Sequence, residues 1–433
     1  MREMASLTRL LREGVETGVF PGAAAAVFGL ETCLHESARG VRWLDGPPVE
    51  VATRFDLASL TKVLATLPAL LLLVDAGEVR LDDRVTRFWP AFGARGKGEV
   101  TLRMLLAHAS GLPAWKPFFL DVLRHEAGRV LMAAKGGRTR QALELAVALG
   151  RDAVLRGVAG AELERGPWQR AVYSDLGFIA LGEVVARVSG TRLDAFVRDE
   201  VHARLDLAGE FSFMPPEAED GDGGQSGDAS VQGEATNIAA TGLFRPREPA
   251  PGQEALVPAP TGTPPEARVG EVDDDNAFVM GGVAGHAGLF GSARGVGLFG
   301  ERVLEEMEGA HRLASVALWQ EVTRRDPRTP GSTRALGFDT PSLTGSSAGG
   351  RIAASRAVGH TGFTGTSLWI DLDRQIAVAL LTNRVHPRRG NEAIRDFRPR
   401  FHEAAMEALE VEVSGGPKGG GAGQGATGTL NRG

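Results

Sequence analysis

The sequence predicts an α+β protein in which an antiparallel sheet, flanked by terminal helices, carries an inserted helical region. Two observations support this prediction. Runs with the length and composition of strands occur near both ends of the chain, at 23–28, 359–371 and 375–383. Between them, apolar residues recur mainly at helical spacing. We therefore expect strands from both ends to share one sheet, which would unite the termini.

At the beginning of the chain, helix and strand signals alternate. Apolar residues at helical spacing predict a helix over 1–18, and the apolar stretch that follows predicts a strand over 23–28. A second strand is expected near 40–43. A long helix should begin near Ser59 and run to about residue 76, where Gly77 supplies a stop signal.

Helices dominate the middle of the chain, and two segments lack any such pattern. Helices are expected over 100–108, 141–155 and 174–188. From 214 to 269 the composition shifts to acidic residues, glycine and proline, which bury too little apolar surface to offset the entropy of ordering. We interpret 214–269 as a largely mobile insertion and the glycine-rich 414–433 as a disordered tail.

The predicted elements form one domain, 1–413, interrupted by the insertion. A tight turn at 372–374 would join the two strand-like runs near the C-terminus. The expected division is an α/β part over about 1–75 and 270–413, a helical part over about 76–213, the insertion 214–269 and the tail 414–433.

Composition and charge narrow the classes of function. Apolar residues make up 43% of the 433 residues and charged residues 24%, which is typical of soluble globular proteins. The net charge of −6 argues against nucleic acid or an anionic membrane surface as a partner, because either would need a basic patch. The longest apolar run, 63–74, is too short to span a bilayer and contains Pro68, so we expect a buried helix.

Cysteine content and the N-terminus say little about compartment. Cys33 is the only cysteine, which excludes intrachain disulfides and is compatible with a reducing compartment. The charged N-terminus shows no signal peptide. The default expectation is a cytoplasmic protein, with export left open because a misplaced start site would hide an exporting signal. The oligomeric state is also left open.

A serine nucleophile is suggested by Ser59-Leu60-Thr61-Lys62, directly before the long apolar run. Positions i and i+3 of a helix share one face, so Lys62 can lie within reach of Ser59. A serine hydroxyl needs a nearby base to act as a nucleophile, and a buried lysine at a helix N-terminus can become one. By itself this pattern more often describes an N-capping serine followed by an exposed lysine.

Two later motifs add candidates for acid–base chemistry and substrate binding. Tyr173-Ser174-Asp175 precedes a predicted helix, and Tyr173 is the only tyrosine in the chain. A phenol beside a lysine can relay a proton, although Ser174 or Asp175 also suits an N-cap. The run His360-Thr361-Gly362 lies in a predicted strand, where small residues let the backbone approach a ligand and present an N–H to an oxyanion.

The three motifs together, in this order, resemble the signature of the active-site serine penicillin-recognising enzymes. The chain is similar to the class C β-lactamase-like serine hydrolases over about 21–387, and 270–290 resembles the penicillin-binding protein 4B-like branch. The resemblance implies the β-lactamase/transpeptidase-like fold and an acyl-enzyme mechanism without a metal or organic cofactor. The similar stretches are 56–62, 105–112, 173–178 and 359–363.

The resemblance also implies roles for individual residues. Ser59 would be acylated, Lys62 would accept its proton, and Tyr173 would relay a proton to the leaving group and help to activate the deacylating water. The oxyanion would lie between the N–H groups of Ser59 and Phe363. The substrate-binding residues would be Asp175, His360, Thr361 and Gly362.

Two departures from the family pattern bear on the substrate. Where the family has asparagine, Asp175 has no N–H to donate, and it should raise the pKa of Lys62 and shift the role of base towards Tyr173. Where the family has lysine, His360 is mostly neutral at pH 7 and is a weaker anchor for a carboxylate. If its charge matters, activity should change as His360 titrates.

These departures leave several functions open. The leading hypothesis is a peptidase or amidase acting on a peptidoglycan-like or D-amino-acid peptide, of the carboxypeptidase or aminopeptidase type. The alternatives are a β-lactamase-fold esterase, a competent β-lactamase, and a non-catalytic penicillin- or muropeptide-binding protein. The partner is a small molecule or a peptide, without nucleic acid and without a membrane span.

Two further polar groups are interpreted as structural. The run Asp273-Asp274-Asp275-Asn276, with His286, could be imagined as a cation site, but we interpret it as a solvated turn because consecutive side chains point apart. His108 is expected to close its helix through hydrogen bonds and not to belong to a catalytic triad. No Gly-x-Ser-x-Gly motif is present, which argues against an α/β-hydrolase.

Overall fold

A five-stranded antiparallel sheet unites the two ends of the chain in the computed structural model, which describes residues 4–132, 139–216, 237–244, 267–342 and 344–414. The strand order is β2-β1-β8-β7-β6. The pairing of β1 with β8 runs from Ala23 opposite Thr382 to Gly29 opposite Ile376. The predicted α+β class is therefore confirmed. The strands are β1 (Gly22–Gly29), β2 (Thr32–Gly40), β6 (Ala357–Thr361), β7 (Ser367–Asp371) and β8 (Ile376–Thr382).

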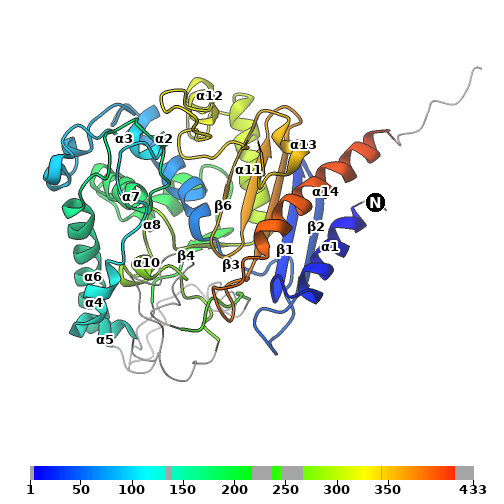
Figure 1. Ribbon diagram of the computed structural model, residues 1–433, viewed down its shortest axis with the longest axis horizontal. Helices are drawn as coiled ribbons and strands as arrows, with labels where there is room; N and C mark the ends of the chain where they lie inside the picture. Colours follow the sequence, from blue (N-terminus) through cyan, green and yellow to red (C-terminus); the bar gives the residue numbers. More distant parts are fainter. Residues whose placement is uncertain (1–3, 133–138, 217–236, 245–266, 343, 415–433) are drawn as a thin grey trace, which may run out of the picture.

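Helices cover both faces of this sheet (Figure 1). On one face lie α1 (Ala5–Glu16) and α14 (Ile394–Ser414), and on the other lies α11 (Ala293–Met307). Successive residues of β1 point to opposite faces and join different apolar cores, as the period of a strand requires. Small residues let α11 come close, since a Cβ on Gly297 would stand 2.5 Å from the Phe28 ring.

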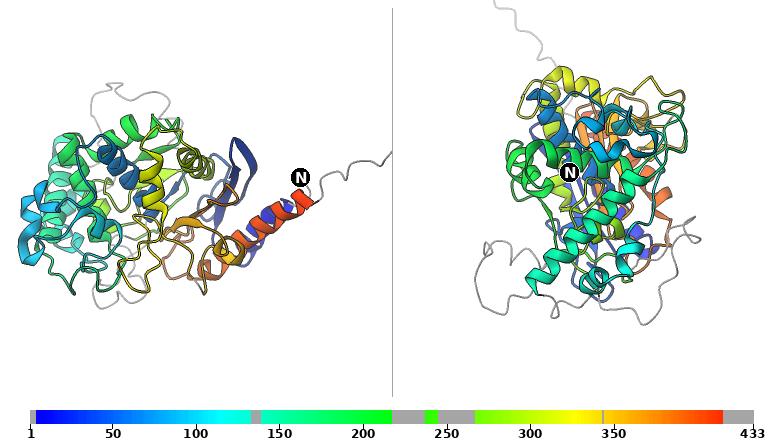
Figure 2. Two further views of the ribbon diagram at one scale, coloured as in Figure 1. Left: turned by 90° about the horizontal axis from the view of Figure 1, so that it is seen from above. Right: turned by 90° about the vertical axis from the view of Figure 1, so that its left-hand side faces the viewer.

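The helical region lies beside the sheet and is best seen from two sides (Figure 2). It comes mainly from the middle of the chain, as predicted. A small sheet of order β3-β5-β4 lies between this region and the five-stranded sheet. The remaining strands are β3 (Phe55–Asp56), β4 (Phe211–Phe213) and β5 (Leu289–Gly291). The helices are α3 (Leu102–Leu106), α4 (Phe119–Leu123), α5 (Glu126–Met132), α6 (Arg140–Gly160), α7 (Asp175–Ser189), α8 (Leu193–Phe196), α10 (Asp275–Val279), α12 (Val316–Thr323) and α13 (Gly349–Ala353).

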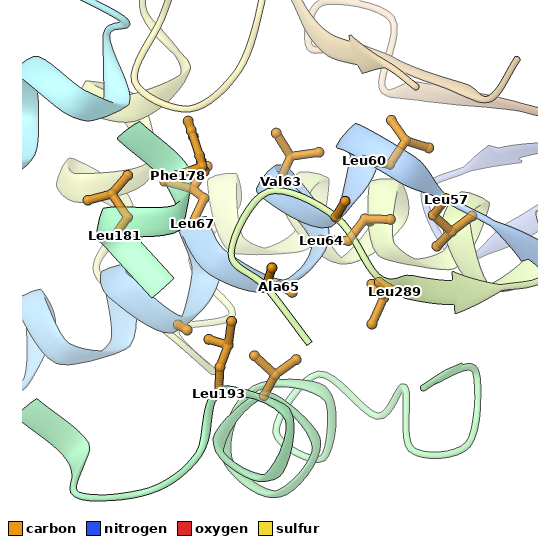
Figure 3. Close-up of a cluster of buried hydrophobic side chains, with 14 of the residues drawn as sticks. Leu57, Leu60, Val63, Leu64, Ala65, Leu67, Phe178, Leu181, Leu193 and Leu289 are labelled. Atoms are coloured by element: carbon orange, nitrogen blue, oxygen red, sulfur yellow. The ribbon is translucent and has the colours of Figure 1, made fainter. Parts of the chain in front are cut away.

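The predicted long apolar helix is present, but it changes its hydrogen-bond pattern along its length. It begins as a 3₁₀ turn (Ala58–Leu60), continues with π-helical pairing (Lys62–Thr66) and ends as α2 (Leu67–Asp75). Its own apolar side chains lie in one buried cluster with Phe178, Leu181, Leu193 and Leu289 from other segments (Figure 3). The window Ala58–Asp75 is apolar and long enough to cross a membrane by composition, yet 78% of it is buried inside the fold. It is the buried core helix that the sequence predicts.

Two strand predictions were wrong. The second strand is β2, at 32–40 and not at 40–43, because this edge strand is polar and half-buried and lacks an apolar run. The run 359–371 is not one strand, because the chain reverses between β6 and β7. The N–H of Gly362 donates to the carbonyl oxygen of Thr366 at 2.7 Å, and Gly365 has a φ of +102°, which favours glycine.

Most of the predicted insertion lies outside the described residues. This applies to 217–236 and 245–266, and also to the tail from 415 onwards. Between them, the described segment 237–244 packs against the body of the protein. Ile238 is buried and forms a parallel bridge with Arg54 beside the small sheet.

The packing of α6 against α10, which holds the chain around Asp275 in place, can be tested by mutation. A Cβ on Gly150 of α6 would stand 2.0 Å from the carbonyl oxygen of Val279. Gly150→Ala should therefore lower the free energy of unfolding by about 1–3 kcal/mol, as overpacking does. The control is Gly160→Ala on the same helix, where a Cβ meets no atom within 4 Å. Equal stability of the two variants in urea unfolding would contradict this packing.

Candidate active site

Ser59 lies in a strained turn that follows β3. The preceding residue, Ala58, has a φ of +47°, in the left-handed region that residues other than glycine rarely adopt. The Asp56 carboxylate holds this turn. It accepts hydrogen bonds from the N–H of Ala58 at 2.8 Å and from the N–H of Asp273 at 2.6 Å. Backbone strain of this kind persists where the surroundings fix it, which is common at functional sites.

The Lys62 side chain lies one turn further on and is fully buried. Its Nζ donates to Ser59 Oγ at 2.8 Å and to the carbonyl oxygen of His286 at 3.1 Å. It also lies 2.8 Å from Asp175 Oδ1. The structure thus brings Ser59 and Lys62 together as their spacing predicts, and it adds Asp175 as the counter-ion of the ammonium.

Tyr173 comes to the same point from the N-terminal end of α7. Its hydroxyl donates to Ser59 Oγ at 2.7 Å. Its ring lies 4.7 Å from the ring of His108, centroid to centroid. His108 accepts a hydrogen bond from the N–H of Ser174 at 3.0 Å, and Ser174 caps α7. His108 therefore helps to hold Tyr173 and Ser174 in place, which agrees with the structural role predicted for it.

The protonation of this cluster follows from burial and charge. Burial lowers the pKa of Lys62, but the Asp175 carboxylate and Tyr173 raise it and prevail, so the pKa lies above its ordinary value. Burial raises the pKa of the Tyr173 hydroxyl, and the Lys62 ammonium only partly opposes this. At neutral pH both groups are protonated and both donate to Ser59 Oγ. One of them must lose its proton before it can act as the base.

His360 lies on β6 and lines the cavity beside Ser59. It is buried, and burial together with the charges of Lys62 and Arg334 lowers its pKa well below the ordinary value. Its Nδ1 lies 2.9 Å from the carbonyl oxygen of Thr361, which acts as the acceptor. The imidazole is therefore neutral at physiological pH. The lowered pKa argues against a change of activity with the titration of His360 near neutral pH, although that expectation stays a prediction until a pH profile is measured.

The predicted oxyanion site combines Ser59 with the turn after β6. Within the described residues, the N–H groups of Ser59 and Phe363 donate no hydrogen bond to another protein group. Both residues line the same cavity. Gly362 is required at the start of this turn, because a Cβ would stand 2.7 Å from the carbonyl oxygen of Leu57. The two N–H groups are available to an oxyanion, and their role as its donors stays a prediction.

Ser59 lines two cavities. The larger, of about 370 Å³, contains Tyr173, His360 and four arginines among its walls. The smaller, of about 150 Å³, is acidic. Phe363 lines both. The four arginines are Arg334, Arg384, Arg395 and Arg398, and the carboxylates of the smaller cavity are Asp175, Asp273, Asp274 and Asp275.

The interpretation of 273–276 as a solvated turn was wrong. Asp273, Asp275 and Asn276 are buried, and the run forms a wall of the smaller cavity. Asp274 caps α10 and accepts a hydrogen bond from His286 Nε2 at 2.9 Å. Asp273 and Asp275 both lie beside the Arg389 guanidinium, at 3.0 and 3.8 Å. Among the described residues, no cluster of three or more histidine, cysteine, aspartate or glutamate side chains has the arrangement of a metal site.

The arginines of the larger cavity are the functional candidates that the sequence analysis missed. They come from separate segments: Arg334 from the loop after α12, Arg384 from the end of β8 and Arg398 from α14. No motif marks them. The only available signal was the density of arginine from 384 to 400, which does not show whether a side chain faces the sheet or solvent.

Comparisons with known proteins agree with this arrangement. Residues 7–398 match the family model described as Beta-lactamase. The chain is 28% identical over 404 residues to an N-acetylmuramyl-L-alanine amidase of Bacillus subtilis (strain 168), covering 89% of this chain and 82% of that protein. It is 28% identical over 346 residues to a putative D-alanyl-D-alanine carboxypeptidase of Escherichia coli (strain K12), covering 77% and 70%. A solved penicillin-binding protein homolog from Caulobacter crescentus shares the fold, with a TM-score of 0.65 and 19% identity over 94% of this chain and 98% of that one.

Replacing the counter-ion of Lys62 should move the pH dependence of catalysis. Asp175→Asn removes the charge that raises the pKa of Lys62, so that pKa should fall. The rising limb of kcat/KM against pH should then shift to lower pH by the same amount. The measurement is hydrolysis of p-nitrophenyl acetate over a broad pH range.

Asp152→Asn is the matched control, because Asp152 lies on the exposed side of α6 and pairs with Arg156. Its profile should coincide with that of the wild type. A rising limb that stays in place in Asp175→Asn, or that moves to higher pH, would show that Asp175 does not control the base.

Proposed function

The chain belongs to the β-lactamase family of serine hydrolases, and we propose that it cleaves peptide-like amides through an acyl-enzyme on Ser59. The proposed substrates are peptides of the peptidoglycan or D-amino-acid type that carry a carboxylate near the scissile bond. The observation that supports this substrate class is the positive charge of the larger cavity beside Ser59.

This positive charge is only partly neutralised by the protein. Arg334 lies 3.4 Å from Asp339, and Arg395 lies 2.8 Å from Glu392. In the described part of the chain, Arg384 and Arg398 have no carboxylate within 4.0 Å, and both donate to carbonyl oxygens. A substrate carboxylate in this cavity would meet a net positive field and could form charge-assisted hydrogen bonds. The arginines thus supply the charge that His360 lacks.

Acylation begins when Ser59 Oγ attacks the carbonyl carbon of the substrate. The serine proton passes to the base, which is Lys62 or Tyr173 in its deprotonated form, and the N–H groups of Ser59 and Phe363 stabilise the oxyanion. The bond to the leaving group then breaks, and the leaving amine takes up a proton through Tyr173. In deacylation, water attacks the serine ester, the acid product leaves and the proton returns to Ser59.

The names of the two relatives point in the same direction. One is an N-acetylmuramyl-L-alanine amidase and the other a putative D-alanyl-D-alanine carboxypeptidase. Both names describe the cleavage of amide bonds in molecules that contain alanine. At 28% identity they support the chemical class of the substrate and leave the individual peptide open.

An esterase is the second candidate, and one observation favours it. Asp175 accepts and cannot donate, so the site lacks the side-chain amide that would bind the carbonyl group of an acylamide substrate. An ester needs no such contact, and its leaving alcohol is easier to expel than an amine. The same feature argues against efficient cleavage of β-lactams.

Covalent labelling tests the nucleophile. The protein and Ser59→Ala are each incubated with a fluorophosphonate, p-nitrophenyl acetate or a penicillin, and intact masses are then measured. Wild type should gain the mass of the adduct, and Ser59→Ala should gain none, because no other hydroxyl among the described residues has Lys62 and Tyr173 beside it. A wild type that no reagent labels would support a non-catalytic binding protein instead.

Arg334 provides a test of the substrate class. An N-acylated D-Ala-D-Ala dipeptide and its C-terminal amide differ only in the carboxylate. Arg334→Gln should lower kcat/KM for the free acid about 10–100-fold, the value of one charge-assisted hydrogen bond. The loss for the amide should be clearly smaller. Equal losses for both substrates would separate Arg334 from carboxylate binding.

A further inference from the structure

A buried arginine binds the turn between β6 and β7, which carries the Phe363 N–H. Arg398, on α14, donates through Nη2 to the carbonyl oxygen of Gly362 and to that of Thr366. The carbonyl of Gly362 and the N–H of Phe363 belong to one planar peptide group. In a trans peptide the C=O and N–H bonds point in opposite directions, so their dipoles are aligned. Arg398 therefore contacts the carbonyl end of a peptide group whose N–H end belongs to Phe363, which lines the cavity beside Ser59.

The charge of Arg398 has no carboxylate partner in the described residues. The side chain is 8% exposed, and its Nε, also buried, has no hydrogen-bond partner there. The charges of Arg384 and Arg395, which act on it, are also positive. Burial and these neighbours lower the pKa of Arg398 to about 9, which leaves it protonated at neutral pH. A buried cation without a counter-ion is costly.

We propose that Arg398 is a positioning residue of the oxyanion site, which polarises the Gly362–Phe363 peptide and makes the Phe363 N–H a stronger donor. A cation bound to a carbonyl draws electron density through the amide group, so the N–H at the other end becomes more positive. Hydrogen bonds in series strengthen one another in this way, most of all where water is excluded. The proposal rests on the acyl-enzyme mechanism proposed above.

Neighbouring hydrogen bonds fix the turn, so the Phe363 N–H does not have to move when the reaction begins. Arg384 Nε donates to the carbonyl oxygen of Phe363 at 2.7 Å, and its guanidinium lies 4.4 Å from the centre of the Phe363 ring. Thr364 Oγ1 donates to the carbonyl oxygen of Asp56 at 2.7 Å, and Thr366 Oγ1 to that of Leu57 at 3.1 Å. The turn and the residues before Ser59 thus form one unit. A preorganised donor of this kind costs no reorganisation when the oxyanion forms.

The carbonyl stretching frequency of the acyl-enzyme tests the proposal directly. Stronger hydrogen bonds to the ester oxygen weaken the C=O bond and lower this frequency. The acetyl-enzyme formed from carbonyl-labelled p-nitrophenyl acetate is followed by rapid-scan infrared difference spectroscopy. The neutral acetyl group has no carboxylate, so the loss of an anion-binding charge cannot affect the result. Acylation kinetics with the same ester are measured in parallel.

Arg398→Met should raise the carbonyl frequency and slow acylation about 10–100-fold, somewhat less than the loss of a whole oxyanion donor. KM for the neutral ester should change little. Arg398→Lys, which keeps the charge, should recover part of both effects. Arg400→Met is the control: it removes a charge two residues away on α14, where Arg400 is exposed and pairs with Glu13, and it should match the wild type.

The outcomes are distinguishable. A wild-type frequency in Arg398→Met overturns the proposal, even if acylation is slower, because a merely structural role predicts that combination. If Arg398→Met does not fold, as judged by circular dichroism, Arg398→Lys decides: a raised frequency supports the proposal and an unchanged one overturns it. A wild type that forms no acetyl-enzyme refutes the proposed function itself.

Discussion

One buried ammonium group connects the parts of the molecule that form the active site. Lys62 Nζ contacts Ser59 on its own helix, Asp175 at the start of α7 and the carbonyl oxygen of His286 before β5. These three partners come from three separate segments, so the position of each depends on the same cation. A charge in a fully buried place is tolerated only when it is paired and hydrogen-bonded, which Asp175 and the two oxygen acceptors provide. The protonation state of Lys62 is thereby tied to the integrity of the whole site.

The two cavities that Ser59 lines differ in charge. The larger cavity carries more arginines than carboxylates, and the smaller cavity carries more carboxylates than arginines. A substrate that spans both cavities would therefore meet opposite fields at its two ends, which orients it before any hydrogen bond forms. The N–H groups of Ser59 and Phe363 would bind an oxyanion whatever the charge of the rest of the substrate. The charges of the two cavities add this discrimination.

The sequence predicted the features that follow from residue spacing and motif order, and it missed the features that depend on burial. The pair Ser59 and Lys62 was accessible because an i, i+3 spacing fixes their distance on any helix. Tyr173 was accessible because of its place in an ordered set of motifs. The arginines of the larger cavity were not, since strands and helices far apart in the chain bring them together. The pKa of His360 and the burial of 273–276 were missed for the same reason: both depend on neighbours that the linear sequence does not reveal.

Because β1 near the N-terminus pairs with β8 near the C-terminus, the sheet beside the active site can form only late in synthesis. Ser59 leaves the ribosome early, but Phe363 and Arg398 follow roughly 300–340 residues later. At about 5–20 residues per second this is a delay on the order of tens of seconds. Throughout that time the nascent chain holds a serine and a lysine without an oxyanion site. A nascent or truncated chain that lacks α14 would thus carry the nucleophile without the complete means to use it.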